Sequence, residues 1–126
     1  MGDRANVKIK ERTGTSIYVY THWEGHEWPE KLREALRAGR ERWHHDQYLQ
    51  RFLITELCKD ADGLTGYGVS TFRGDNEHDV FEVDMKEQKV RKLSEEGWFD
   101  GGEWNPKVLE EWTFAEYTES ESESLV

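Results

Sequence analysis

The sequence has a single cysteine, Cys58, and only two prolines among its 126 residues. One cysteine cannot form an intrachain disulfide, and it excludes the zinc modules that are built from several cysteines. No apolar run approaches the ~20 residues of a membrane-spanning helix, and mean hydropathy is −0.97. The N-terminal segment also lacks the apolar core of a secretory signal. We therefore expect a cytoplasmic protein with no membrane partner.

Basic residues are nearly missing from the last third of the chain. Residues 94–126 carry ten acidic side chains and one base, Lys107, whereas residues 1–93 carry 17 acids and 16 bases. The net charge of −10 therefore belongs almost entirely to the C-terminal third. A uniformly basic nucleic-acid-binding protein is excluded, and no direct binding to nucleic acid is expected. The near-neutral body can still receive a small anion.

The body of the chain has the patterns of both strands and helices. Leucines at helical spacing predict a helix at 29–39, which Pro29 is suited to begin, and a second after Asp46 that ends near Lys59. Alternating, β-branched and aromatic residues predict five strands, at 7–10, 17–21, 67–72, 80–85 and 89–93. The order ββααβββ predicts an α+β fold of two layers, in which an antiparallel sheet of about five strands packs against two helices.

The same patterns divide the chain into three parts. Residues 1–93 are predicted to form the α+β domain. Residues 94–117 form an acidic, tryptophan-rich extension without a clear period. Residues 118–126 alternate serine with glutamate and have little to bury, so they are predicted to be a disordered acidic tail.

Aromatic content is the least ordinary feature, because six tryptophans occur in this short chain. Tryptophan usually packs in a core, where it buries a large area. An indole in a loop can instead stack on a flat ligand such as a nucleobase. Trp23 and Trp43 fit this second role, because both lie in predicted loops beside polar residues.

Basic residues gather in the same region and favour arginine over lysine. The guanidinium group suits phosphate binding and aromatic stacking better than an ammonium group does. A solvated face with ion pairs to Glu30 and Glu34 is the alternative interpretation. The members of the cluster are Lys31, Arg33, Arg37, Arg40, Arg42 and Arg51.

Five histidines raise the question of a metal site. His22 and His26 could bind zinc together with a carboxylate such as Glu24 or Glu77. The two histidines lie in a predicted loop rather than on a helix with a glutamate between them, so the metalloprotease pattern is not met. We assign no metal and no other cofactor, and keep His22 and His26 as weak metal candidates.

Several segments of the body resemble those of a known family. They are YTHWxG at 20–25, GRxRW at 39–43, TGYGVS at 65–70 and DNEH at 75–78. The chain is similar, over residues 6–93, to a family of small uncharacterised proteins from phages, prophages and bacteria. The resemblance implies a small accessory protein, acting in the host cytoplasm, of the kind that often counters host defence by binding rather than by catalysis.

The leading hypothesis is a non-enzymatic protein that sequesters an anionic nucleotide-type signal molecule. Because tight sequestration favours pockets shared between subunits, a homo-oligomer is expected. One alternative is an acidic protein-binding inhibitor or DNA mimic, and another is a metal-assisted phosphodiesterase. The predicted ligand contacts are His22, Trp23, Arg40, Arg42, Trp43, Arg51, Ser70, Thr71 and Asn76.

Overall fold

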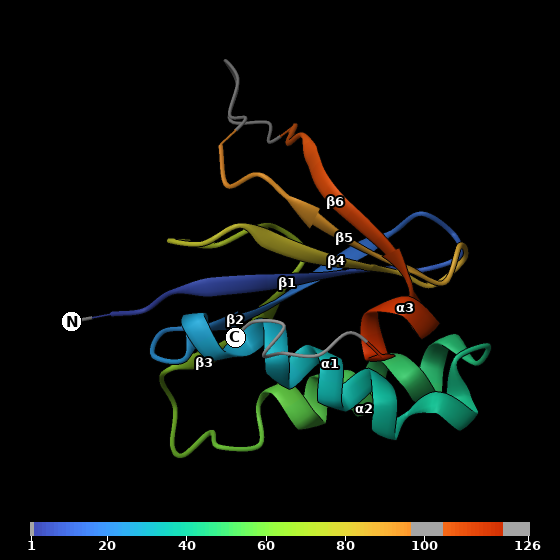
Figure 1. Ribbon diagram of the computed structural model, residues 1–126. Coiled ribbons are helices and arrows are strands. Elements are labelled where there is room, and N and C mark those ends of the chain that lie inside the picture. The colour runs from blue at the N-terminus through green and yellow to red at the C-terminus, as the bar shows by residue number, and fades with distance from the viewer. Residues whose placement is uncertain (1, 97–104, 120–126) are drawn as a thin grey trace.

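The computed structural model describes residues 2–96 and 105–119 (Figure 1). It confirms the α+β class. Within these residues, none of the helices has the length and apolar character that a membrane span requires. The elements are β1 (Ala5–Lys10), β2 (Ser16–Thr21), η1 (Gly25–Glu27), α1 (Trp28–Ala38), η2 (Arg40–Arg42), α2 (Asp46–Leu57), β3 (Tyr67–Ser70), β4 (Val80–Asp84), β5 (Lys89–Leu93), β6 (Val108–Thr113) and α3 (Phe114–Glu119).

The strands form one mixed, six-stranded sheet in the order β3-β2-β1-β4-β5-β6. β1 and β4 run parallel, and every other neighbouring pair is antiparallel. The prediction of about five strands, all antiparallel, is therefore wrong in both number and direction. The alternation of apolar and polar residues identifies a strand, but it does not show which strands pair with it in the sheet. Here the connection of residues 71–79 leads the chain from β3, at one edge, past β1 to its far side.

The sixth strand comes from the acidic segment after residue 93. Its carboxylates face the bases of β5: Glu110 lies 3.7 Å from Lys92, and Glu111 lies 2.6 Å from Arg91. Such cross-strand pairs of opposite charge stabilise antiparallel pairing. The negative charge of this segment is therefore partly a pairing signal for the basic strand β5.

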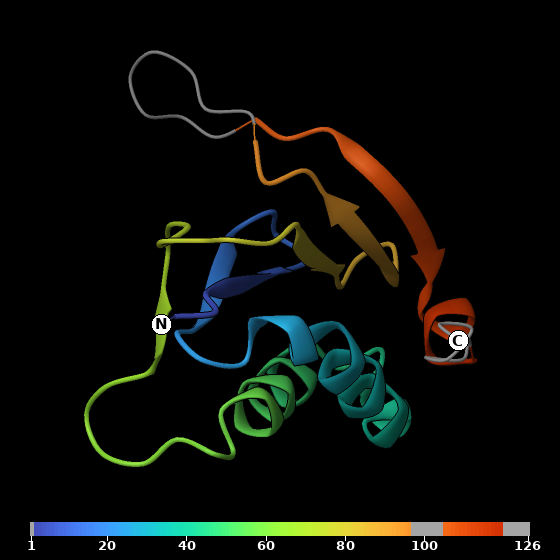
Figure 2. The same cartoon turned by 60° about the vertical axis from the view of Figure 1, so that its left-hand side comes forward.

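Helices α1 and α2 lie side by side against one face of the sheet, here called the inner face (Figure 2). Alternate strand residues point toward them, as the period of two requires. On the opposite, outer face the strands carry charged side chains. The core of the inner face includes Val7, Ile9, Val19, Leu32, Leu36, Leu49, Leu53, Leu57 and Val83.

The two main helices begin within a residue of their expected starts. α1 begins at Trp28 with Pro29 in its first turn, where the missing N–H of proline costs no hydrogen bond. α2 is capped by His45, whose Nδ1 accepts from the N–H of Tyr48. Asp46, after which this helix was predicted to begin, is its first residue and binds Arg12 through an ion pair of 3.2 Å.

Helix α3 follows β6 directly and packs beside α1. Phe114 and Tyr117 belong to the buried core, and the hydroxyl of Tyr117 donates to the carbonyl of Pro29 at 2.6 Å. Thr118, where the disordered tail was predicted to start, is buried in this helix. Glu119 ends the same helix, and residues 120–126 of that tail lie outside the described residues, as do residues 97–104.

Candidate functional site

A pocket of about 640 Å³ lies between the N-terminal end of α1 and the inner face of the sheet. Its volume falls within the roughly 300–1,000 Å³ that is typical of small-molecule sites. Strands β1, β4, β5 and β6 form its wall on the sheet side, because α1 and α2 leave this part of the inner face uncovered. The side chains that give it chemical character are Trp28, Phe81 and Trp112, with His26, Glu30, Arg33, His78, Asp79, Lys92 and Glu110.

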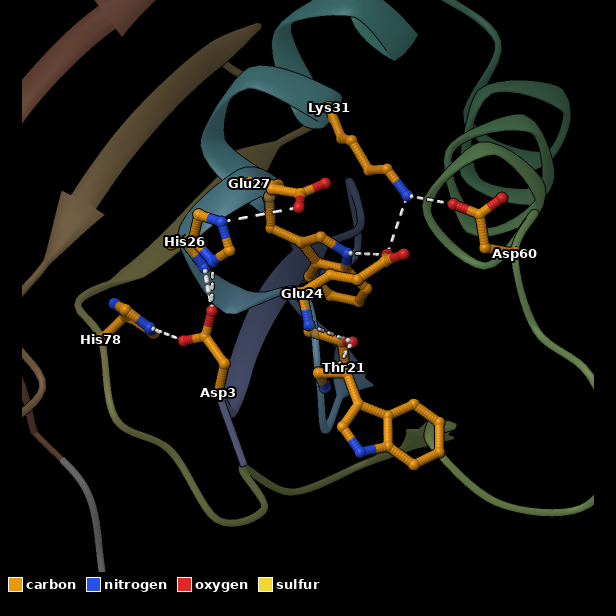
Figure 3. A network of polar contacts seen from close by, with 10 residues as sticks. Asp3, Thr21, Glu24, His26, Glu27, Lys31, Asp60 and His78 are labelled. Carbon is orange, nitrogen blue, oxygen red and sulfur yellow. Dashed lines mark hydrogen bonds and ion pairs between the residues drawn. The ribbon is translucent and has the colours of Figure 1, made fainter. Parts of the chain in front are cut away.

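The entry to α1 is fixed by a polar network on Glu24 (Figure 3). The carboxylate of Glu24 accepts from the indole N–H of buried Trp28 at 3.3 Å and from Lys31 at 2.8 Å. Lys31 also binds Asp60, beyond α2, at 2.9 Å. The network thus holds η1, α1 and the end of α2 together behind the pocket.

A second polar cluster, the Asp3 node, lies at the pocket rim and consists of Asp3, His26 and His78 (Figure 3). The Asp3 carboxylate lies between the two imidazoles, with one oxygen on Nδ1 of His26 and the other 2.5 Å from Nε2 of His78. The backbone N–H of His26 donates to the same carboxylate at 3.0 Å. One carboxylate therefore fixes the orientation of two imidazoles, both of which line the pocket.

The Asp3 node carries charge that depends on pH. Hydrogen bonds from His26 and His78 hold the pKa of the Asp3 carboxyl well below its usual range. The same hydrogen bond to Asp3 raises the pKa of His26 above 6.5. A raised histidine pKa stabilises the folded state most below about pH 6.5, and this contribution is lost as pH rises through the raised value.

Gly25 permits the close contacts of the Asp3 node. A methyl group there would lie 2.7 Å from the carbonyl oxygen of Asp3 and 2.7 Å from Cδ2 of His78. We expect Gly25→Ala to displace both residues and to lower the free energy of unfolding by about 1–3 kcal/mol, as overpacking does. Urea titration measures the change. The control is Gly74→Ala, whose methyl group would meet no atom closer than 3.8 Å; equal losses in both variants would contradict the prediction.

Aromatic rings form the side of the pocket toward β6. Phe81 and Trp112 stack with ring centroids 6.2 Å apart and planes 12° apart, and Trp112 packs on Tyr117 at 5.1 Å. Arg33 lies over the Tyr117 ring at 4.6 Å and donates to the Tyr117 carbonyl at 2.9 Å. Burial raises the pKa of the Tyr117 phenol, so this residue is a neutral packing group.

The cations at the pocket differ in their availability. Arg33 is buried and forms an ion pair of 2.5 Å with Glu30, so it serves mainly to position α1 and α3. The Lys92 ammonium is partly exposed and lies 3.7 Å from Glu110, which is beyond normal hydrogen-bond length. Lys92 can therefore turn toward a bound anion without losing a tight partner.

The predicted contacts His22 and Trp23 lie at the end of β2, near the start of α1. Nδ1 of His22 is 3.1 Å from the Tyr20 hydroxyl. The Trp23 ring packs edge-on against Tyr67, with a centroid distance of 6.4 Å, and covers Gly66. This ring is 52% exposed, so it retains an accessible surface.

Two of the predicted arginine contacts, Arg40 and Arg42, lie beyond the opposite end of α1, which at 11 residues is about 16 Å long. Arg40 lies over the Trp43 ring at 4.8 Å, and the Trp43 indole donates to the Leu36 carbonyl at 2.9 Å. Arg42 covers Tyr48, while Arg51 lies exposed on α2. The structure therefore does not bring Trp23 and Trp43 into one site.

The three remaining predicted contacts lie in or after β3. Ser70 donates to the carbonyl of Phe72 at 2.7 Å, and Thr71 is exposed. Asn76 accepts from the amide of Asn6 at 3.2 Å and donates to the carbonyl of His78. Asn76 therefore supports the loop that carries His78, at the rim of the pocket.

Sequence reasoning did not select most of the pocket residues. Lys92 carried a signal, because the period of two places it on the same strand face as buried Val90. Phe81 shares its face with Val83, and its ring partner Trp112 comes from the acidic segment. Asp3 had no such signal, since its role depends on two histidines that are distant in sequence.

The sequence offered His22 and His26 as weak candidates for metal ligands. Within residues 2–96 and 105–119, no three histidine, cysteine, aspartate or glutamate side chains are placed to hold a metal ion. Of the two weak candidates, His22 contacts Tyr20 and His26 contacts Asp3.

Comparison of the chain with protein-family models, with curated proteins and with solved structures found no match.

Proposed function

We propose that this chain is a non-enzymatic binding protein that sequesters an anionic, nucleotide-type molecule in the pocket beside the Asp3 node. The observation that carries the proposal is a pocket of about 640 Å³ that combines an aromatic wall with a lysine and two histidines. Aromatic rings stack with bases, and cationic groups bind phosphate. From the segments at 20–25, 39–43, 65–70 and 75–78 that resemble a family of small phage proteins, we further propose that the molecule removed is a host signal.

The ligand would lie along the stacked pair of Phe81 and Trp112, with its base against the indole. Its phosphate would then be within reach of Lys92 and of the histidines of the Asp3 node. Arg33 is already bound to Glu30 and Tyr117, so the ligand gains its charge contacts from the other cations. This distinction selects Lys92 for the test.

The acidic groups and the histidine at the pocket together make binding of an anion depend on pH. Asp79 and Glu110 also line it, and they oppose an anion at neutral pH. Protonation of His26 adds a positive charge, and the hydrogen bond to Asp3 raises the pKa of this imidazole. Affinity for the anion is therefore expected to increase as pH falls from about 8 to about 6.

The binding prediction concerns Lys92→Gln. Calorimetric titration with cyclic oligonucleotides, mononucleotides and ADP-ribose derivatives identifies a binding compound. For that compound, Lys92→Gln should weaken binding about 10- to 100-fold, which corresponds to one charge-assisted hydrogen bond. The matched control is Arg42→Gln, which removes a cation from the predicted arginine cluster that covers Tyr48, and it should bind like the wild type.

Two outcomes would contradict this function. One is the absence of micromolar or tighter binding across the whole panel. The other is a loss of binding in Arg42→Gln with none in Lys92→Gln, which would place the site in the arginine cluster. The described residues that line the pocket all lie between Ala5 and Trp112, so a chain lacking residues 120–126 should retain binding.

The acidic inhibitor or DNA mimic has less support. It needs carboxylates that are available to a partner and spaced like phosphates. On β6, Glu111 is instead bound at 2.6 Å by Arg91 of the same sheet.

A further inference from the structure

The two edge strands of the sheet differ in how they are protected. Edges in soluble proteins usually carry charges, proline or bulges that prevent pairing with another chain. At one edge, β6 carries Glu110 and Glu111, and its register with β5 shifts near Leu93. At the other edge, β3 lies within the stretch Leu64–Phe72, which contains no charged residue and no proline. Among the described residues, no strand pairs with the outer side of β3 (Figure 2).

The hydrogen-bond pattern shows which backbone groups of β3 point outward. The N–H of His22, at the end of β2, donates to the carbonyl of Gly66 at 2.8 Å. In an antiparallel ladder the bonded positions alternate, so Gly68 and Ser70 also face β2. Tyr67 and Val69 therefore direct their N–H and C=O groups away from the sheet.

The side chains at this edge also have unfilled space beside them. Val69 is 53% exposed and Phe72 is 68% exposed, although both are apolar. Gly68, between the two outward-facing residues, has no atom within 4 Å of the position that a side chain would take. A glycine inside a strand often marks the close approach of another backbone.

We infer that β3 pairs antiparallel with β3 of a second copy of this chain, so that two sheets join into one. In the register that uses both outward-facing residues, Tyr67 of each copy bonds Val69 of the other, around a twofold axis at Gly68. Gly68 then faces its own copy in a non-bonded pair, where Cα atoms come to about 4.5 Å. This inference is independent of the ligand proposed above.

Two observations favour a second copy over a different partner strand. The bonding pattern is self-complementary, because one twofold operation matches each donor of Tyr67 and Val69 with an acceptor. The second observation is the net charge. Two copies that each carry a charge of −10 repel one another, and contact through an uncharged edge strand minimises that repulsion. A different protein that binds this acidic chain would be expected to use basic residues. The β3 edge has no carboxylate with which such basic residues could pair.

The test compares Val69→Lys with Leu109→Lys in the full chain. Leu109 is 49% exposed on the opposite edge strand, β6. Sedimentation equilibrium should show wild-type dimers and Leu109→Lys dimers of equal affinity. Val69→Lys places two like charges beside the joined strands, so its dimer dissociation constant should rise about tenfold or more.

Amide hydrogen exchange gives a readout at the strand itself. The Val69 amide points outward, so it should be protected only at concentrations where dimers form. The Gly68 amide faces β2 and should be protected at every concentration. A wild-type chain that stays monomeric, a dimer that Val69→Lys leaves unchanged, or a Val69 amide that exchanges freely in the dimer would overturn the inference.

Discussion

Replacing Phe114 with alanine is expected to lower the free energy of unfolding by about 3–5 kcal/mol. Phe114 is 1% exposed at the junction of β6 and α3, and its ring packs against Trp43 at 5.3 Å. Its removal would leave a cavity between α3, η2 and the sheet, because these elements meet at its side chain. Chemical denaturation with a two-state fit measures the loss.

The matched control for Phe114 is Leu109→Ala on the adjoining strand. Leu109 is about half exposed, so its truncation should change the free energy of unfolding by no more than about 0.5 kcal/mol. If Phe114→Ala were as mild as Leu109→Ala, residues 105–119 would be an appendage to a domain that is stable without them. A large loss in Phe114→Ala alone makes them part of the cooperative fold.

The elements between residues 5 and 93 follow from local patterns in the sequence. The alternation in β1 and β4 can be recognised from the residues of each strand alone. The same holds for the helical spacing of Leu32 and Leu36. The parallel neighbours β1 and β4 could not be found in this way, because strand pairing depends on segments more than 70 residues apart. β6 lies in the acidic segment that has no clear period, and its pairing depends on Lys92 and Arg91 of β5, which face Glu110 and Glu111.

The candidate site was harder to predict than the fold. Its residues come from both ends of the chain and from four strands, so no single motif contains them. Trp23 and Trp43 flank α1 in sequence, yet the length of the helix separates them. His26 and His78 were each noticed, but Asp3 unites them only because the chain before β1 lies beside η1.

A buried ion network lies on the outer face of the sheet, on strands β4 and β5. Arg91 of β5 donates to Glu82 at 2.9 Å and to Asp84 at 2.7 Å, both on β4. The side chains of Glu82 and Asp84 are only 7% and 3% exposed. Asp84 also accepts from the N–H groups of Lys86 and Glu87, which closes the β4–β5 hairpin.

Arg91→Met is expected to lower the free energy of unfolding at neutral pH by about 3–5 kcal/mol. The methionine keeps much of the apolar volume, so the loss reports the two carboxylates that remain buried without their main cation. Lys8 and Lys10 stay near Glu82 and Asp84, at 3.1 and 3.9 Å, and limit the loss. Thermal and urea denaturation at several pH values measure it.

The pH dependence separates this electrostatic cause from a simple packing defect. In the wild type, burial raises the pKa of Asp84, but hydrogen bonds from Arg91 and the Glu87 amide lower it more, so the net pKa is depressed. Wild-type stability from this group is therefore present above about pH 4 and is lost as pH falls through the depressed value.

Without Arg91, burial of Asp84 is opposed by fewer hydrogen bonds, so its pKa must rise relative to the wild type. In the variant, Asp84 therefore takes up a proton at a higher pH than in the wild type, and this protonation removes the cost of burying its unpaired charge. The stability gap between the two proteins should accordingly narrow as pH falls from about 7 to about 4. The double variant Arg91→Met with Asp84→Asn should recover part of the loss at pH 7 and flatten the profile. A gap that is the same at every pH would instead assign the effect of Arg91 to packing of its aliphatic stem.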